Sequence, residues 1–172
     1  MCQDDEKKSL LIAHGNSPMC SILEQWRRER PDIDAEPMAV CGDIWRIGEI
    51  LRQGVTANWS NWDLDLAGSD VMLTLRRQGK GQTLSPSELA KDMMLSTSAM
   101  TNRLDRLEKR GLIERMPDPD DRRGLRIGLT EKGYAMVEEM IVSHVETENK
   151  MISALTKQER QQLRALLGKI TA

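Results

Sequence analysis

The sequence predicts a mainly α-helical fold with one small β-hairpin. Its 172 residues are 39% apolar but only 3% aromatic, with eleven Met, four Trp, one Tyr and no Phe. A core of Leu, Ile, Val, Ala and Met suits helix packing better than a β-sandwich. Apolar residues recur at helical spacing along most of the chain, and this period gives way only at two short segments around a loop rich in Pro, Asp and Gly.

Three helices are predicted in the first half of the chain. The first covers about residues 9–30, and the segment 30–37 ends it because its two prolines cannot continue a helix. The second has its apolar stripe at Val40, Ile44, Ile47 and Leu51. The turn-rich segment 58–63 is expected to break this second helix, and a third covers residues 66–78, before Gly79.

Two helices joined by a tight turn are predicted next. Ser85 begins the first of them, with Glu88 three residues later, which is the pattern of a capping box. This helix is expected to stop near Leu95, and a second restarts at residues 96–98 and runs to Gly111. The buried stripe of the second helix is Met100, Leu104 and Leu107. Its other side is polar and basic, which is typical of a helix-turn-helix.

A basic β-hairpin is predicted directly after these helices. Its strands lie at residues 112–116 and 125–129, on either side of the Pro-, Asp- and Gly-rich loop. A hairpin at this place is typical of the wing of a winged helix-turn-helix. Thr130 then begins a long helix, and Thr156 with Glu159 forms a second capping box at the start of a final helix.

Basic residues gather in the middle of the chain. Between Arg76 and Arg126 there are twelve Lys/Arg and eight Asp/Glu, a local charge of +4 that leaves −6 on the rest. The net charge of the whole chain, −2, hides this distribution. A basic centre between acidic ends is typical of a DNA-reading lobe, and a charged, solvated surface is the alternative interpretation.

Other classes of protein are not indicated. The two His and three Cys have no CxxC or HxxxH spacing, so neither a metal nor another cofactor is predicted. The chain has no GxSxG, P-loop, HExxH or GxGxxG motif, which argues against an enzyme. No apolar run is long enough to span a membrane, and the polar, acidic start is not typical of a signal peptide. We therefore expect a cytoplasmic protein with reduced thiols.

Four linked motifs resemble the MarR family of winged helix-turn-helix transcriptional regulators. They are LSPSELA at 84–90, NRLDRLEKRGLI at 102–113, DPDDRR at 118–123 and LTEKG at 129–133. The resemblance extends over roughly residues 37–172. It implies a ligand-responsive repressor that acts as a symmetric homodimer on double-stranded DNA, at a pseudo-palindromic operator with half-sites about 10 bp apart.

The resemblance also implies a division of the chain into four parts. An N-terminal extension helix and its connection occupy residues 1–36, and a dimerisation helix with a hinge occupies 37–66. The winged helix-turn-helix lobe occupies 67–130, and the C-terminal dimerisation helices occupy 131–172.

DNA contacts are implied for one helix and for the wing, at Ser98, Thr101, Asn102, Arg103, Arg106, Arg122 and Arg123. The helix residues would reach base edges or phosphates in the major groove. The wing arginines would reach the adjacent minor groove, where narrow A·T-rich stretches concentrate negative potential. Internal ion pairs are the alternative for Arg103 and Arg123, the latter with Asp121.

Residues 25–34 are similar to the extra N-terminal helix of the urate-responsive MarR branch. This similarity implies an effector pocket formed by Trp26, Asp70 and Arg103, with Arg122 or Arg123. A flat, anionic purine such as urate would stack on the indole, pair with guanidinium and repel Asp70, and so release DNA. The chain departs from that branch at Ser69, where an aromatic residue is common. Packing of Trp26 in a dimer core is the alternative, and a small aromatic or anionic effector is the broader prediction.

Cys41 supports an alternative function, a redox-sensing regulator. Cys41 lies at the start of the second predicted helix. A Cys at this place resembles the organic-hydroperoxide branch of the family, in which a thiolate is oxidised. That branch uses tyrosines and this chain has only Tyr134, so we expect Cys41 to be a buried structural thiol. A dimeric adaptor that does not bind DNA is a further alternative, because the long terminal helices could form a dimer without any DNA-binding role. Three other aromatic residues are expected in the core or hinge: Trp45, Trp59 and Trp62.

Overall fold

The computed structural model describes residues 18–93, 100–121 and 123–170. The chain divides into two compact units, residues 1–52 and 53–172. Helix α2 (Pro18–Glu29) and most of helix α3 (Glu36–Trp59) belong to the first unit. The helix expected over residues 9–30 is thus confirmed from Pro18 onward, and residues 9–17 lie outside the described residues.

The connection between α2 and α3 is held by two carboxylates. The guanidinium of Arg30 donates to both oxygens of Asp32, at 2.7 and 2.6 Å. The carboxylate of Asp34 accepts a hydrogen bond from the backbone N–H of Glu36 at 3.0 Å, and α3 begins there. Ala35 is buried, whereas its charged neighbours face solvent.

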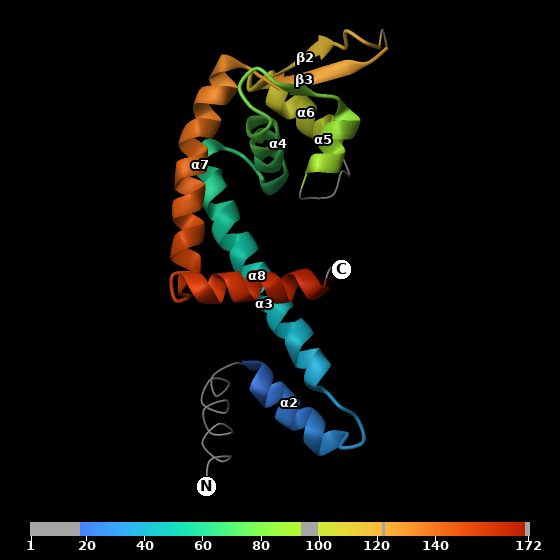
Figure 1. Cartoon of the computed structure of the whole chain (residues 1–172), viewed down its shortest axis with the longest axis vertical. Coiled ribbons are helices and arrows are strands. Elements are labelled where there is room, and N and C mark those ends of the chain that lie inside the picture. Colours follow the sequence, from blue (N-terminus) through green and yellow to red (C-terminus); the bar gives the residue numbers. More distant parts are fainter. Residues whose placement is uncertain (1–17, 94–99, 122, 171–172) are drawn as a thin grey trace. The chain divides into compact units, whose positions relative to one another are not determined.

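The second unit contains the C-terminal end of α3 and all later elements (Figure 1). In chain order these are the 3₁₀ turn η1 (Ser60–Trp62), α4 (Leu66–Arg77), β1 (Thr83–Leu84), α5 (Pro86–Asp92), α6 (Met100–Lys109), β2 (Ile113–Pro117), β3 (Leu125–Leu129), α7 (Glu131–Met151) and α8 (Lys157–Ile170). Helices α4, α5 and α6 and the sheet pack against one another, and α7 contacts both α4 and β3. The predicted mainly α-helical, winged helix-turn-helix fold is confirmed.

The turn-rich segment 58–63 was expected to break the second helix, but α3 continues into this segment and ends at Trp59. Contacts with α7 explain the difference. Trp59 is only 5% exposed, and its ring centroid lies 5.0 Å from that of His144. The amide of Asn58 donates a hydrogen bond to the hydroxyl of Ser143 at 2.7 Å. These tertiary contacts outweigh the weak local helix preference of the segment.

The sheet has three antiparallel strands in the order β1-β3-β2, one more than the predicted hairpin. Strand β2 pairs with β3 from Ile113 opposite Leu129 to Pro117 opposite Leu125. The two-residue strand β1 adds to the other edge of β3, with Thr83 opposite Gly128. Figure 1 shows β2 and β3 projecting together beyond α5 and α6 as a wing.

The core of the second unit is aliphatic and rich in Met, as the composition predicted. Its fully buried side chains include Met72, Leu75, Leu89, Leu112, Ile113, Ile127, Val137 and Met140. On α6, Leu104 and Leu107 are buried and Met100 is half-buried, so the predicted stripe is confirmed. Each fully buried aliphatic side chain contributes about 1.5–3 kcal/mol of transfer free energy to this core.

Three predicted helix starts are confirmed by their hydrogen bonds. The Ser85 hydroxyl accepts from the backbone N–H of Glu88 at 3.2 Å, and the Glu88 carboxylate accepts from the backbone N–H of Ser85 at 2.8 Å. Thr130 caps α7 by accepting from the N–H of Gly133 at 3.0 Å. Thr156 begins α8, with its backbone N–H donating to a carboxylate three residues later at 2.7 Å.

The tryptophans differ in their surroundings. Trp59 is in the core and Trp62 packs against it, as expected. The expectation is wrong for Trp45, which is 75% exposed in the single chain. Over the described residues, no helix combines the length and apolar character needed to cross a membrane.

Candidate nucleic-acid interface

Helix α6 presents a polar face away from the core. Leu104 and Leu107 fix one side of the helix against the lobe. Thr101, Asn102 and Arg106 are exposed on the rest of its surface, as the DNA-contact prediction requires. The side chain of Arg106 is 77% exposed, so its guanidinium is accessible to a large ligand. Ser98, the remaining helix residue of that prediction, lies outside the described residues.

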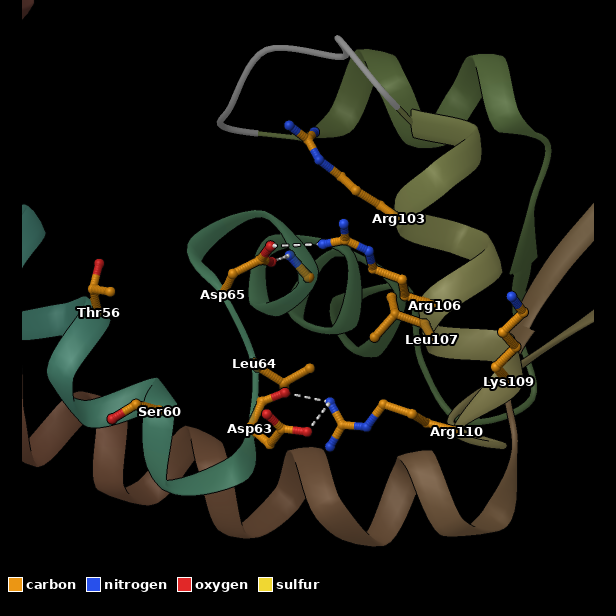
Figure 2. Close-up of a pocket in the computed structure, with 11 residues that line it drawn as sticks. Thr56, Ser60, Asp63, Leu64, Asp65, Arg103, Arg106, Leu107, Lys109 and Arg110 are labelled. Atoms are coloured by element: carbon orange, nitrogen blue, oxygen red, sulfur yellow. Dashed lines mark hydrogen bonds and ion pairs between the residues drawn. The ribbon is translucent and has the colours of Figure 1, made fainter.

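A pocket of about 620 Å³ lies between α6 and the segment that joins α3 to α4 (Figure 2). Four cations from α6 and its C-terminal end line it, namely Arg103, Arg106, Lys109 and Arg110. The facing segment contributes Thr56, Ser60, Asp63, Leu64, Asp65 and Gly68. The charges of the lining residues sum to +2, which favours an anionic ligand.

Two of the charged groups in this pocket have structural roles. Asp65 caps α4, because its carboxylate accepts from the backbone N–H of Gly68 at 2.7 Å. Arg110 donates to the backbone carbonyl oxygens of Trp62, at 2.8 Å, and of Asp63. The guanidinium of Arg110 therefore holds the joining segment in place, and its hydrogen bonds are already made within the protein.

Arg106 is held much less firmly. Its nearest carboxylate oxygen, on Asp65, lies 3.9 Å away, and both side chains are mostly exposed (Figure 2). Exposed ion pairs at such a distance contribute little free energy, because water and salt screen them. The guanidinium of Arg106 can therefore leave Asp65 for a phosphate at small cost.

The described residues of the wing loop form a turn held by the carboxylates of Asp118 and Asp121. Gly124 accepts from the backbone N–H of Asp118 at 3.0 Å and donates to the carbonyl oxygen of Asp121 at 2.8 Å. The Asp121 carboxylate accepts from the backbone N–H of Arg123 at 2.9 Å. The ion pair that was the alternative interpretation for Arg123, with the side chain of Asp121, is not found, although both residues are described. Arg123 is exposed, as a minor-groove contact requires, and Arg122 lies outside the described residues.

Two other arginines of the basic centre are bound within the lobe. Arg115 on β2 pairs with Asp105 at 2.6 Å and with Glu108 at 2.5 Å, and so ties the sheet to α6. Arg126 on β3 contacts Glu88 and residues of the sheet and wing. The local charge of +4 thus overstates the number of cations that face outward.

Glu88 gives the lobe a predictable pH dependence. Its pKa lies below the ordinary value mainly because the backbone N–H of Ser85 donates to it, aided by the Ser85 side chain and by Arg126. A lowered pKa in the folded state means that ionised Glu88 stabilises the fold above the unfolded-state pKa. This stabilisation is lost as the pH falls through the folded-state pKa.

We therefore expect the free energy of unfolding to fall on acidification below about pH 5, and to fall less in Glu88→Gln. Urea unfolding at a series of pH values measures the difference. Glu24→Gln, which changes an exposed glutamate on α2, is the matched control. Identical pH profiles for Glu88→Gln and the unchanged chain would contradict the assignment.

The structure places the predicted effector residues in different surroundings. Arg103 is half-buried on α6 and lines the cationic pocket. Asp70 is on α4, only 5% exposed, and is not among the residues that line this pocket. Trp26 is half-buried on α2, in the first unit. Their assembly into one site stays a prediction.

Cys41 is exposed, so the expectation of a buried structural thiol is wrong for the single chain. It lines an apolar groove of the first unit together with Met38, Trp45 and neighbours on α2 and α3. Within the described part of the chain, no three His, Cys, Asp or Glu residues lie where they could hold a metal ion.

The acidic side of the pocket was not predicted from the sequence. Asp63 and Asp65 come from the turn between two helices, and their position opposite α6 is a matter of tertiary structure. A helix-cap pattern was available for Asp65, which directly precedes the apolar start of α4. Nothing local indicated that the same carboxylate faces Arg106.

An exposed polar helix, a preceding capped helix and a projecting strand pair define a winged helix-turn-helix DNA-binding protein. The MarR family profile matches residues 70–125. The chain is 40% identical to the HTH-type transcriptional regulator PecS of Dickeya dadantii over 149 residues, 87% of this chain and 90% of PecS. The chain belongs to the MarR family.

Two solved structures share its fold. A MarR mutant from Escherichia coli in complex with operator DNA has a TM-score of 0.70 and 27% identity, over 80% of this chain and 97% of that one. BpsR from Bordetella bronchiseptica, whose DNA binding is regulated by 6-hydroxynicotinic acid, has a TM-score of 0.68 and 26% identity, over 77% and 92%. The chain is thus a transcriptional regulator of a family that binds operator DNA, and not an enzyme.

Proposed function

We propose that this protein is a homodimeric repressor that leaves a pseudo-palindromic operator when a small anionic effector binds. One observation carries the proposal. Arg103 and Arg106 lie on α6, the helix that we propose to enter the major groove, and both also line the cationic pocket. An anion in the pocket draws the same guanidinium groups that contact the operator, so the two ligands oppose each other.

The chemistry of the pocket narrows the effector class. Guanidinium and ammonium groups from α6 bind a carboxylate, phenolate or urate oxygen. The hydroxyls of Thr56 and Ser60 offer hydrogen bonds on the opposite wall. No aromatic side chain is among the described lining residues, so the pocket itself favours the anionic group of an effector and offers no ring for stacking. The related BpsR, which responds to 6-hydroxynicotinic acid, supports a small anionic effector.

Exposed apolar stripes on the terminal helices support the homodimer. Helix α8 exposes Leu163, Leu166, Leu167 and Ile170, and α7 exposes Val142 and Val145. The first unit exposes a further set on α3, Val40, Ile44, Ile47 and Ile50. Apolar areas of this extent are rarely left to water, and a symmetric pair of chains covers them. A dimer also matches two half-sites of a palindromic operator.

The proposal is tested by titrating urate, xanthine and salicylate into the complex with the DNA upstream of the protein's own gene. We expect at least one of them to weaken operator binding by about tenfold or more, and to quench tryptophan fluorescence. A change in neither quantity with any of the three compounds would contradict the proposed effector class.

A variant that removes one negative charge from the pocket tests whether the effector binds there. Asp65→Asn keeps an oxygen to cap α4 but removes a negative charge from the pocket wall, so we expect an active anion to bind several-fold tighter. Asp34→Asn is the control, because Asp34 also accepts a backbone N–H but lies in the first unit. Equal effects of the two variants would place the effector elsewhere.

A further inference from the structure

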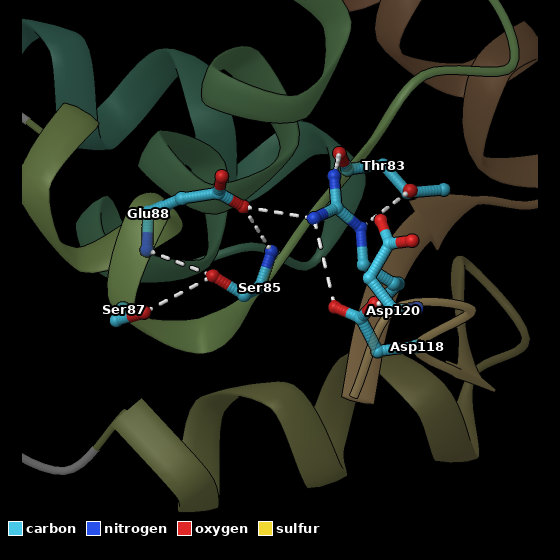
Figure 3. A network of polar contacts seen from close by, with 7 residues as sticks. Thr83, Ser85, Ser87, Glu88, Asp118 and Asp120 are labelled. Carbon is cyan, nitrogen blue, oxygen red and sulfur yellow. Dashed lines mark hydrogen bonds and ion pairs between the residues drawn. The ribbon is translucent and has the colours of Figure 1, made fainter. Parts of the chain in front are cut away.

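One side chain joins the wing to the beginning of the helix-turn-helix. Arg126 belongs to β3, and its guanidinium contacts four acceptors on β1, α5 and the wing loop (Figure 3). It donates to the backbone carbonyl oxygen of Thr83 at 2.5 Å and to the hydroxyl of Thr83 at 3.1 Å. It donates to the carboxylate of Glu88 at 3.2 Å, and lies 3.7 Å from that of Asp118.

Two of the three charged groups in this network are largely shielded from solvent. The side chain of Arg126 is 27% exposed and that of Asp118 is 14% exposed, whereas that of Glu88 is 51% exposed. Partial burial strengthens a charge pair relative to one in open water, and a planar guanidinium holds several acceptors at fixed angles. Without Arg126, the carboxylates of Glu88 and Asp118 would be left without their shared cation.

Asp118 connects Arg126 to the described residues of the wing loop. Its backbone N–H donates to the carbonyl oxygen of Gly124, and its carboxylate accepts from the backbone N–H of Asp120 at 2.9 Å. A Cβ on Gly124 would lie 2.8 Å from that of Asp118, so the returning strand lies directly against it. A change in the position of Asp118 therefore moves the loop that carries Arg123.

Glu88 ties the other end of the network to the helix-turn-helix. The same carboxylate oxygen that meets Arg126 accepts the backbone N–H of Ser85, at the N-terminus of α5 (Figure 3). Arg126 thus bridges the cap of α5 and the base of the wing. Both elements have to meet one DNA duplex at the same time, so their relative angle determines whether the wing reaches its groove.

We propose that Arg126 is a positioning residue for DNA binding, which sets the angle of the wing relative to the helix-turn-helix through Glu88 and Asp118. It acts through the wing and does not itself contact DNA. The proposal rests on the wing contacting the groove beside the one occupied by α6.

Hydroxyl-radical footprinting on the upstream DNA, combined with a salt titration of affinity, tests this role. In Arg126→Met we expect protection of the flanking sequences contacted by the wing to be lost, while protection of the sequences under α6 persists. The dissociation constant should rise about tenfold, and the slope of log K against log salt should fall by about one per half-site as the wing phosphate contact is lost. Arg126→Lys retains the charge but not the planar fork, and should give an intermediate footprint.

Asp118→Asn provides a second, milder variant. It leaves an oxygen for the N–H of Asp120 and keeps Arg126, but removes the charge at the wing end of the bridge. It should reproduce the loss of flanking protection, and it decides the matter if Arg126→Met does not fold. Arg76→Met is the control, because Arg76 is 28% exposed and bridges α4 to Glu138 on α7, away from the wing.

Three results would overturn the proposal. The first is a uniform loss of protection in Arg126→Met with an unchanged salt slope, which indicates general destabilisation. The second is the same loss of flanking protection in Arg76→Met. The third is flanking protection that disappears in Arg123→Ala but persists in both Arg126→Met and Asp118→Asn, which leaves the wing contact in place without this positioning role.

Discussion

Replacing Arg103 and Arg106 together with alanine is expected to lower operator affinity about 100-fold at physiological salt. Both side chains project from α6, and Arg106 is mostly exposed, with only a long contact to Asp65 to give up. Binding releases about one counterion for each phosphate contact. Because the variant lacks two such contacts on each bound α6, the slope of log K against log salt should become shallower by about two for each helix.

Fluorescence anisotropy with labelled upstream DNA between about 0.05 and 0.3 M salt measures both quantities. The double variant Lys157→Ala/Lys169→Ala is the matched control, because it removes two exposed cations from α8, outside the lobe. It should leave the slope nearly unchanged. Equal losses in the two double variants would show that net charge, and not the face of α6, governs binding.

Gly133→Ala is expected to destabilise the fold by about 4 kcal/mol or more, at the upper end of the range for point substitutions. Gly133 is buried in the first turn of α7, where the chain passes close to the backbone before β2. A Cβ there would overlap the carbonyl oxygen of Leu112 and lie 2.8 Å from its carbonyl carbon. Neither backbone can move freely, because the N–H of Thr130 donates to that same carbonyl oxygen at 3.2 Å.

Gly168→Ala provides the contrast within the same chain. A Cβ on Gly168 meets no atom within 4 Å, and the residue is exposed on α8. Alanine should therefore stabilise the helix there by up to about 1 kcal/mol. Urea unfolding followed by circular dichroism compares the two variants. A midpoint for Gly133→Ala within error of that of the unchanged chain would contradict the packing described for α7.

Local chemistry predicted the helix starts and the basic wing. Ser85, Thr130 and Thr156 are followed three residues later by the groups that complete each cap, so a short window of sequence contains the whole interaction. The buried stripe of α6 was equally predictable, because helical periodicity alone aligns Leu104 with Leu107.

Features that depend on distant partners were not predictable in this way. Strand β1 is two residues long and exists because Thr83 meets Gly128, 45 positions further along the chain. Trp45 and Cys41 lie on an apolar helix face that the single chain leaves exposed, and periodicity does not say which apolar face finds a partner. The Arg126 network likewise joins residues up to 43 positions apart.

In the proposed regulation, DNA and the effector compete for side chains of the same helix, α6. A ligand can change DNA affinity only through interactions that differ between the free and DNA-bound states. Arg103 and Arg106 line the pocket and are also the residues that we propose to contact DNA, so they would satisfy this condition. An effector then needs no long-range pathway, since it acts on the side chains that the operator also requires.

The most direct test of the central claim is the affinity of the unchanged chain for its own upstream DNA across a salt series. We predict a specific complex whose log K falls steeply and linearly with log salt, against an unrelated duplex of the same length. Binding that does not distinguish the two duplexes at any near-physiological salt concentration would contradict the assignment of this chain as an operator-binding regulator.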